Sequence, residues 1–364
     1  MRHPRAATLH RVIKYLGSKR LLVPVLTEVA TAVGATTAVD LFTGTTRVAQ
    51  GLKRAGIHVT GVDVATYSKV LADCFVATDA REVDQVRLAA VVAELAALPG
   101  KDGYVTRTFC ENARFIQPHN GRRIDAIRDA IEDLGDDPLR PILLTALLLA
   151  ADRVDSTTGQ QMAYLKDWSK RSFRDLDLRV PELLEGPGRA VLGDATLAVE
   201  MLEPVDLAYL DPPYNQHRYY TNYHVWETLI RWDEPEHYGI ACKRLDARDP
   251  ATKSVFNSKP RMADALRDLV ERVSADVVVV SYNDEAWVEP QAMERLLRDA
   301  GHEEVAVLAF DQKRYVGAQI GIHSPHGVRT GSVSHLRNTE LVFVAGPRDR
   351  VAEVARLDGV REPA

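Results

Sequence analysis

The chain has 364 residues, enough for one large domain or two of modest size, and its hydrophobic and charged fractions of 46% and 27% are those of a globular protein. Its net charge is −5, from 46 Lys and Arg against 51 Asp and Glu, which excludes a surface that is basic throughout. Any contact with nucleic acid must therefore be local.

Three isolated cysteines favour a reducing compartment. Cys74, Cys110 and Cys242 lack metal-ligand spacing, and their odd number argues against a disulfide framework. The N-terminal residues 1–17 are basic but lack the apolar centre of a signal peptide. The longest apolar stretch, residues 142–151, is about half of the ~20 residues that a bilayer span needs, so it indicates a buried helix. We therefore expect a cytoplasmic protein with no membrane contact and no metal.

Short apolar and β-branched runs predict seven strands. The first two, at 36–42 and 57–63, flank a helix in which Val48, Leu52 and Ala55 fall at helical spacing. Strand, helix and strand in this order predict a parallel βαβ unit. Five more strands are expected, with the last two as an antiparallel hairpin, at 188–194, 205–211, 275–283, 303–310 and 339–346. The predicted fold is an α/β, Rossmann-like sheet of seven mostly parallel strands.

The long stretch between the second and third strands is helical in period. Residues 84–98, 122–134 and 141–155 all repeat apolar side chains at helical spacing. We expect a helical target-recognition insert at 75–184 within a discontinuous catalytic domain. That domain comprises residues 1–74 and 185–346, and a C-terminal tail with a short surface helix occupies 347–364.

Four predicted strands are followed by an acid: Asp40, Asp63, Asp194 and Asp211. Any one of them could be a helix N-cap or a turn residue. In an open α/β sheet, however, ligands bind at the carboxyl ends of the strands. Four acids at that edge predict a ligand that offers hydroxyl and amino groups.

The loop after the first strand, "DLFTGTT" at 40–46, places Gly44 where backbone must approach a ligand closely. It contains neither GxGxxG nor GxxxxGK[ST], the two glycine-rich patterns that bind nucleotide phosphates. This favours a cofactor without phosphate. A nucleoside attached to an amino acid, such as S-adenosylmethionine, fits these requirements.

Two consecutive prolines distinguish the stretch "LDPPYNQHRYYTNYHVW" at 210–226. Pro212 and Pro213 fix φ and lack N–H donors, so neighbouring carbonyls stay free to accept hydrogen bonds. Asp211 adds a carboxylate and Tyr214 an aromatic face, which together suit a planar ring bearing NH2, such as a base extruded from a duplex. Hydrogen bonds from that amine would favour a pyramidal nitrogen that can attack a methyl on a sulfonium. The carboxylate would stabilise the positive charge that develops there.

These residues resemble the S-adenosylmethionine-dependent amino-methyltransferases, specifically the D12 class of DNA adenine-N6 methyltransferases. "DPPYNQHRYYTNYHVWETL" resembles the catalytic motif of that class, "KYLGSKRLL" its N-terminal cofactor motif and "VDLFTGTTRVAQGLKRAG" its cofactor loop. Their order is that of the alpha group. Other segments, among them "ENARFIQPHNGRRIDAIRDAI" and "SHLRNTELVFV", resemble the modification enzymes of restriction systems.

The resemblance implies an enzyme that methylates N6 of a flipped-out adenine in double-stranded DNA, with a cognate restriction endonuclease as a partner. The catalytic and base-holding residues would be Asp211, Pro212, Pro213 and Tyr214. The cofactor contacts would come from Tyr15, Gly17, Lys19, Asp40, Phe42, Gly44, Asp63 and Asp194, with Asp63 at the ribose and Asp194 at the adenine. Thr46 departs from the family pattern, which often has a second glycine there, and its β-branched side chain stiffens the loop.

Basic residues interleaved with rings predict DNA contacts from the insert, although a solvated helix face is an alternative for each. The candidates are Arg114, Arg122, Arg123, Lys170 and Arg171. Tyr219, Tyr220 and Tyr223 are choices for a second ring at the extruded base, with Tyr219 and Tyr223 preferred. The central motif also occurs in other methyltransferases. Cytosine-N4 DNA methylation, adenine-N6 RNA methylation and a catalytically silent DNA-binding protein therefore remain alternatives.

Overall fold

The computed structural model describes residues 12–17, 19–213, 216, 218–283, 286–313 and 337–357, without the side chains of residues 251, 311–313 and 337–338. Its main sheet has seven strands in the order β3-β2-β1-β4-β7-β9-β8. They are β1 (Thr37–Asp40), β2 (His58–Asp63), β3 (Gly188–Leu192), β4 (Val205–Leu210), β7 (Ala275–Asn283), β8 (Glu304–Lys313) and β9 (Arg337–Gly346). Neighbours from β3 to β7 are parallel, and β9 is antiparallel to both β7 and β8. The predicted fold class is confirmed.

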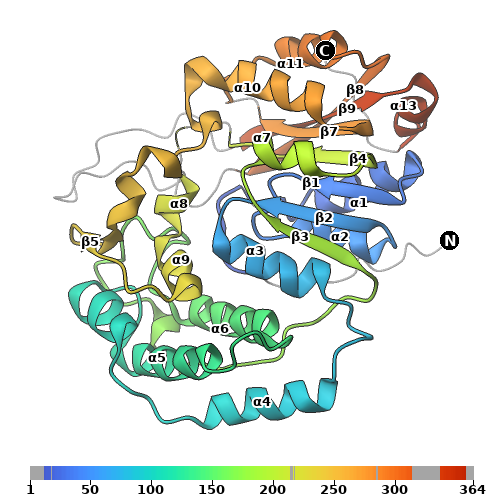
Figure 1. Ribbon diagram of the computed structural model, residues 1–364. Coiled ribbons are helices and arrows are strands. Elements are labelled where there is room, and N and C mark those ends of the chain that lie inside the picture. Colours follow the sequence, from blue (N-terminus) through green and yellow to red (C-terminus); the bar gives the residue numbers. More distant parts are fainter. Residues whose placement is uncertain are drawn as a thin grey trace.

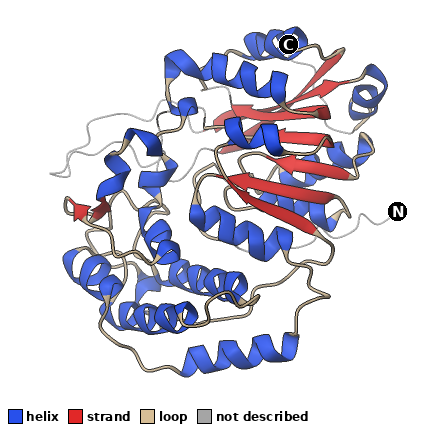
Figure 2. Cartoon of the chain, viewed as in Figure 1, coloured by secondary structure: helices blue, strands red, loops and turns tan. Residues whose placement is uncertain are grey.

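Helices cover both faces of the sheet (Figures 1 and 2). One face packs against α1 (Val23–Ala32), α2 (Arg47–Arg54) and α13 (Arg348–Val354), and the other against α7 (Ala195–Ala198), α10 (Lys259–Arg272) and α11 (Pro290–Asp299). Along β7, Val277 and Val279 belong to the first core while Val278 and Val280 belong to the second. Burial on both sides explains why this strand is a continuous apolar run in the sequence.

A second, helical part lies below and to the left of the sheet in the view of Figure 1. It comprises α4 (Gln85–Ala97), α5 (Pro118–Glu132) and α6 (Arg140–Val154), joined by α3 (Thr66–Ala72), α8 (Tyr219–Asn222) and α9 (His224–Arg231). Two π-helical turns (Asp73–Ala77 and Thr106–Asn112) and a small hairpin of β5 (His237–Tyr238) and β6 (Lys243–Arg244) complete it. The apolar stretch at 142–151 forms the buried centre of α6, as predicted. None of the described helices is both long and apolar enough to cross a bilayer.

The core of this helical part draws on residues well outside the predicted insert, among them Val12 and Ile13 near the N-terminus. Besides the predicted insert, it contains Tyr67 and Leu71 from α3 and Trp226 and Leu229 from α9. The three cysteines are buried and unpaired. The proposed limits of the insert, 75–184, remain a prediction, because the helices that pack there come from both sides of those limits.

Candidate active site

The acids predicted at the strand ends lie along one edge of the sheet. Following the strand order, Asp194 comes after β3, Asp63 ends β2, Asp40 ends β1 and Asp211 follows β4. A cavity of about 370 Å³ opens at this edge. Asp63, Asp194 and Asp211 line it together with Pro213, whereas Asp40 is buried and does not.

The glycine after β1 has a conformation that favours glycine, and its close approach to a ligand remains a prediction. Gly44 has φ +50°, and a Cβ there would lie 3.2 Å from Cε1 of Tyr15, so a larger side chain would collide with that ring. Its N–H donates to Oδ2 of Asp63 at 2.8 Å, and the N–H of Ala65 donates to Oδ1 at 2.9 Å. Asp63 thus joins the loop after β1 to the end of β2. Burial raises the pKa of its carboxyl.

Thr46 holds a conformation that glycine usually supplies. Its φ is 61°, in the left-handed region, which is unfavourable for a β-branched residue. The side-chain amide of Gln50 donates to Oγ1 of Thr46 at 2.8 Å, and that hydroxyl donates to the carbonyl of Thr45 at 2.7 Å. These bonds hold the left-handed turn from which α2 begins. The departure from the family pattern therefore leaves the loop's glycine-like conformation in place.

The N-terminal segment reaches the cavity through stacked tyrosines. The ring of Tyr15 stacks on that of Tyr223, with centroids 4.5 Å apart, and on that of Tyr219 at 5.2 Å. The N–H of Leu16 donates to the Tyr223 hydroxyl at 2.6 Å. Tyr15, Gly17 and Tyr219 line the cavity, but Tyr223 is fully buried. An extruded base could stack on Tyr223 only if Tyr15 first moved away.

The catalytic candidate Asp211 has a buried cation beside it. Nζ of Lys19 lies 3.1 Å from Oδ1 of Asp211 and 3.4 Å from Oε2 of Glu340 on β9. Burial raises the pKa of Asp211 to about 6, although the Lys19 ammonium lowers it. Lys19 is not among the residues that line the cavity, and it pairs with Asp211. Its contact with the cofactor remains a prediction. Pro212 is buried, and Tyr214 lies outside the described residues.

Two further acids differ in their surroundings. Asp40 is 1% exposed, and among the described residues its Oδ1 has no hydrogen-bond partner. Its pKa is raised to about 7, chiefly by burial and also by the nearby carboxylates of Asp211 and Asp63. Asp194 is the N-cap of α7, because its Oδ1 accepts from the N–H of Thr196 at 2.9 Å. Asp194 therefore caps α7 and also lines the cavity.

Several residues that line the cavity had no role predicted from the sequence. They are Glu227, Arg231, Asp246, Thr252, Lys253, Ser254, Phe256 and Asn257. Glu227 is 2% exposed and accepts from the N–H of Thr66 at 3.0 Å, which ties α9 to the start of α3. The stretch "HVWETL" belongs to the segment that resembles the family motif, but its spacing alone gives Glu227 no partner. Such contacts between distant segments appear only in the folded chain.

The predicted DNA contacts of the insert do not line this cavity. Arg122 pairs with Asp102 at 2.6 Å, and Arg123 donates to the carbonyl of Ala96 on α4. Arg114 donates to the carbonyl of Lys166 and stacks over Trp168. Arg171 pairs with Asp155 at 2.6 Å, while Lys170 beside it is exposed. Their DNA-binding roles remain predictions.

No cluster suited to a metal occurs in the part of the chain that the structure describes: no three His, Cys, Asp or Glu side chains are arranged to hold an ion. The cavity instead offers carboxylates, a glycine backbone and tyrosine rings. These groups suit an uncharged ring system with hydroxyl and amino substituents.

Comparisons with known proteins agree with this arrangement. The family described as D12 class N6 adenine-specific DNA methyltransferase matches residues 15–296. Modification methylase StsI of Streptococcus sanguinis is 28% identical over 306 residues, covering 79% of this chain and 46% of that protein. Type II methyltransferase M.FokI of Planomicrobium okeanokoites is 31% identical over 199 residues, covering 53% of this chain and 30% of that protein. The chain thus spans less than half the length of these two relatives.

Similarity to solved structures is weak. A precorrin-6y C5,15-methyltransferase from Geobacter metallireducens matches at 10% identity over 92% of this chain and 93% of its own, with a TM-score of 0.28. That score is too low to carry an argument about this site.

Proposed function

The chain belongs to the D12 class of N6 adenine-specific DNA methyltransferases, and we propose that it transfers a methyl group from S-adenosylmethionine to N6 of an adenine flipped out of double-stranded DNA. One observation carries this proposal: Asp211 and Pro213 line the same cavity as Gly44, Asp63 and Asp194. A group that holds an amine and the groups that suit a nucleoside cofactor therefore share one space.

The cavity fits S-adenosylmethionine by the chemistry of its lining. Asp63 and Asp194 present carboxylate oxygens to hydroxyl and amino groups, and the glycine turn at Gly44 lets backbone approach closely. Tyr15, Gly17 and Phe42 complete this part of the wall. Asp40 lies beneath it with a buried oxygen that has no partner among the described residues. When bound, the cofactor supplies a methyl group on a positively charged sulfonium.

Asp211 has the chemistry that an amine nucleophile requires. Its carboxylate can accept a hydrogen bond from the exocyclic amino group and stabilise the positive charge that forms there during transfer. Lys19, at 3.1 Å, favours the ionised carboxylate in a buried setting that otherwise disfavours it. Pro212 and Pro213 have no N–H of their own, so their backbone does not compete with the amine for the acceptors of this corner. Holding amine and methyl in line supplies much of the remaining acceleration.

The relative from Streptococcus sanguinis is named a modification methylase. On that basis we propose that this chain is the modification enzyme of a restriction–modification system, with a cognate endonuclease as its partner and the cytoplasm as its location. The family match favours adenine N6 over cytosine N4 and over a catalytically silent DNA-binding protein.

Methyl transfer to DNA tests the proposal directly. Purified protein should transfer a radiolabelled methyl group from S-adenosylmethionine to genomic DNA from a host that lacks methylation. Digestion to nucleosides should then place the label in N6-methyldeoxyadenosine. Asp211→Ala should lower kcat by roughly 10²–10³-fold, because the acceptor for the developing charge is lost. Its affinity for S-adenosylmethionine, measured by calorimetry, should stay near that of the wild type.

Asp276→Ala is the matched control. Asp276 lies on the neighbouring strand β7, near that strand's start, and its side chain pairs with Arg350 at the surface. This variant should keep wild-type activity. A label found in N4-methyldeoxycytidine, or normal turnover by Asp211→Ala, would contradict the proposal.

A further inference from the structure

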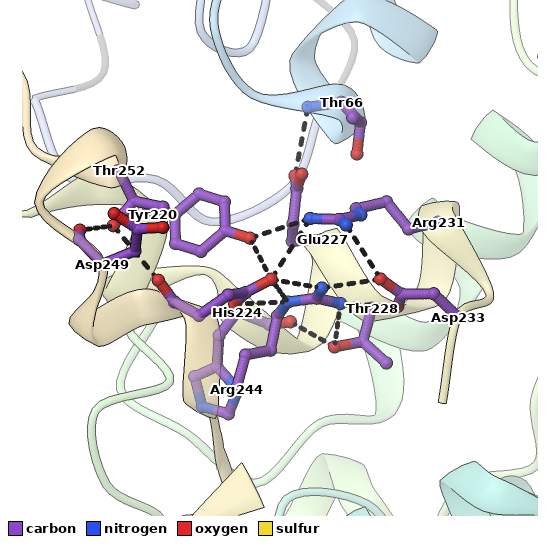
Figure 3. Close-up of polar contacts among 11 residues, drawn as sticks. Thr66, Tyr220, His224, Glu227, Thr228, Arg231, Asp233, Arg244, Asp249 and Thr252 are labelled. Carbon is purple, nitrogen blue, oxygen red and sulfur yellow. Dashed lines mark hydrogen bonds and ion pairs between the residues drawn. The ribbon is translucent and has the colours of Figure 1, made fainter. Parts of the chain in front are cut away.

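A buried arginine organises the segment that follows α9. Arg244 is 1% exposed, and its guanidinium binds two carboxylates at once. Nη1 and Nη2 each lie 2.7 Å from an oxygen of Asp233 (Figure 3). Nη2 also lies 2.7 Å from Oδ2 of Asp246, and Nε lies 3.1 Å from Oδ1 of Asp246. The planar fork of arginine matches two such acceptors, which the ammonium of lysine cannot do.

A second arginine closes this network on the side of the cavity. Arg231, whose side chain is 39% exposed, approaches Asp233 at 3.0 Å and Asp246 at 3.3 Å. Asp233 therefore bridges the two guanidinium groups, as Figure 3 shows. The positive charges of the two arginines balance the negative charges of Asp233 and Asp246. Arg244 is the buried member of this network, whereas the side chains of Arg231, Asp233 and Asp246 are 30–39% exposed. Loss of a carboxylate would leave the buried charge of Arg244 incompletely paired.

The network ends on Tyr220. The Tyr220 hydroxyl donates to Oδ2 of Asp246 at 3.0 Å and accepts from Nη1 of Arg231 at 3.0 Å. Tyr220 lines the cavity together with Asp211 and Pro213. Burial raises its pKa to about 12, so the phenol keeps the proton that it donates to Asp246. Both polar interactions lock the hydroxyl end of the ring.

We propose that Arg244 is a positioning residue for the target base: through Asp246 it fixes Tyr220, whose ring stacks on the extruded adenine. The inference rests on the proposed function and names the ring that the sequence left open. Of the three candidate tyrosines, Tyr223 is buried and Tyr219 is stacked on Tyr15. Tyr220 instead reaches the wall from the network, and its contacts do not involve the N-terminal cofactor segment.

Steady-state kinetics on unmethylated genomic DNA separate this role from a purely structural one. Tyr220→Ala should raise KM for DNA by roughly ten- to a hundredfold, the range expected for loss of one base–aromatic stack. Affinity for S-adenosylmethionine should not change, because the cofactor contacts lie on other elements. Tyr220→Phe keeps the ring and should lose much less. Tyr238→Ala is the matched control, because Tyr238 lies in the same segment but does not line the cavity.

A double-mutant cycle tests whether Arg244 acts through Tyr220. Arg244→Met should raise KM for DNA by a factor close to that of Tyr220→Ala, and the double variant should be no worse than either alone. Effects that multiply fully would show that Arg244 acts elsewhere and would overturn its assigned role. If Arg244→Met does not fold, Asp246→Leu removes both acceptor oxygens, and with them the same link to Tyr220, with little change in side-chain size.

The result for the wild type distinguishes the two proposals. Absence of methyl transfer by the wild type would contradict the proposed function itself. An active wild type combined with an unchanged KM in Tyr220→Ala would overturn only the assignment of the ring.

Discussion

At the scale of single residues, the pair Lys19–Asp211 shows how the fold controls the ionisation of the carboxylate that we propose as catalytic. The pKa of Asp211 is raised to about 6. Burial is the largest cause, the Lys19 ammonium lowers the pKa, and the charge of Glu340 raises it. The carboxyl of Asp40 and the phenol of Tyr209 both lie near Asp211 and interact with its carboxylate electrostatically. Asp211 must be ionised to stabilise positive charge, so the cation at 3.1 Å extends its working range toward lower pH.

The pH dependence of kcat tests this role of Lys19. Wild-type kcat should fall as the pH drops through about 6, because Asp211 becomes protonated there. Lys19→Met removes the charge that favours the carboxylate, so the acidic limb should move to higher pH. Lys19→Arg keeps the charge and should leave the limb near its wild-type position. An acidic limb that Lys19→Met does not move would assign the titration to another group, with Asp40 the first to examine.

The residue scale also shows where sequence reasoning succeeds. The acids at the strand ends were predictable because parallel strands bring their carboxyl ends to one edge, whatever the rest of the chain does. Lys19 was placed near the cofactor by resemblance, but its partner, Asp211, is 192 positions away along the chain, a separation that no local pattern encodes. Tyr223 shows the same limit, because its burial depends on stacking with Tyr15.

At the scale of elements, α9 connects the catalytic corner to the helical part. Its last carbonyls, those of Leu229 and Ile230, accept from Nε and Nη2 of Arg128 on α5 at 2.8 and 3.0 Å. Arg128 is fully buried and also stacks over Trp232. It supplies donors to carbonyls that the end of a helix leaves unpaired. Helix α5 therefore anchors the far end of the helix that follows the catalytic motif.

Removing this anchor should destabilise the protein measurably. Arg128→Met leaves buried carbonyls without donors, which should lower the free energy of unfolding by about 2–4 kcal/mol. The midpoint of urea unfolding measures the loss. Arg140→Met is the control, because Arg140 is partly exposed and also pairs with Glu132 but does not reach α9. Its cost should stay below about 1 kcal/mol. Equal losses in the two variants would mean that the carbonyls of α9 do not depend on Arg128.

Strands were easier to predict than the helices around the site. Apolar and β-branched runs located all seven strands, most clearly β7, which is buried on both faces, whereas β3 is only partly buried. The helices α8 and α9 were not anticipated, because the aromatic run was interpreted only as rings that could contact the base. In α9, however, Val225, Trp226, Leu229 and Ile230 do fall at helical spacing. The segment of Arg244 was missed for another reason. Its order comes from ion pairs between loop residues, and these leave no period in the sequence.

At the scale of the whole molecule, the two groups of predicted DNA contacts occupy different places. Arg122 and Arg123 hold Asp102 and the α4 carbonyl of Ala96. Arg171 instead shares Asp155 with Lys14, the residue before Tyr15 in the cavity wall. The group around Lys170 and Arg171 is therefore linked to the segment that lines the active site, and we expect it to contribute more to DNA binding.

Salt dependence of DNA binding separates the two groups. Each phosphate contact contributes about 0.9 to the slope of log K against log salt concentration on duplex DNA. Lys170→Ala, at an exposed side chain, should reduce that slope by about 1 and weaken binding at low salt. Arg122→Ala should change it less, because Arg122 is already paired with Asp102. Titration of a labelled duplex at several salt concentrations measures both slopes. A larger change from Arg122→Ala would indicate that the duplex binds over α4 and α5 rather than beside the N-terminal segment. That result would contradict the expectation that the group around Lys170 and Arg171 contributes more to DNA binding.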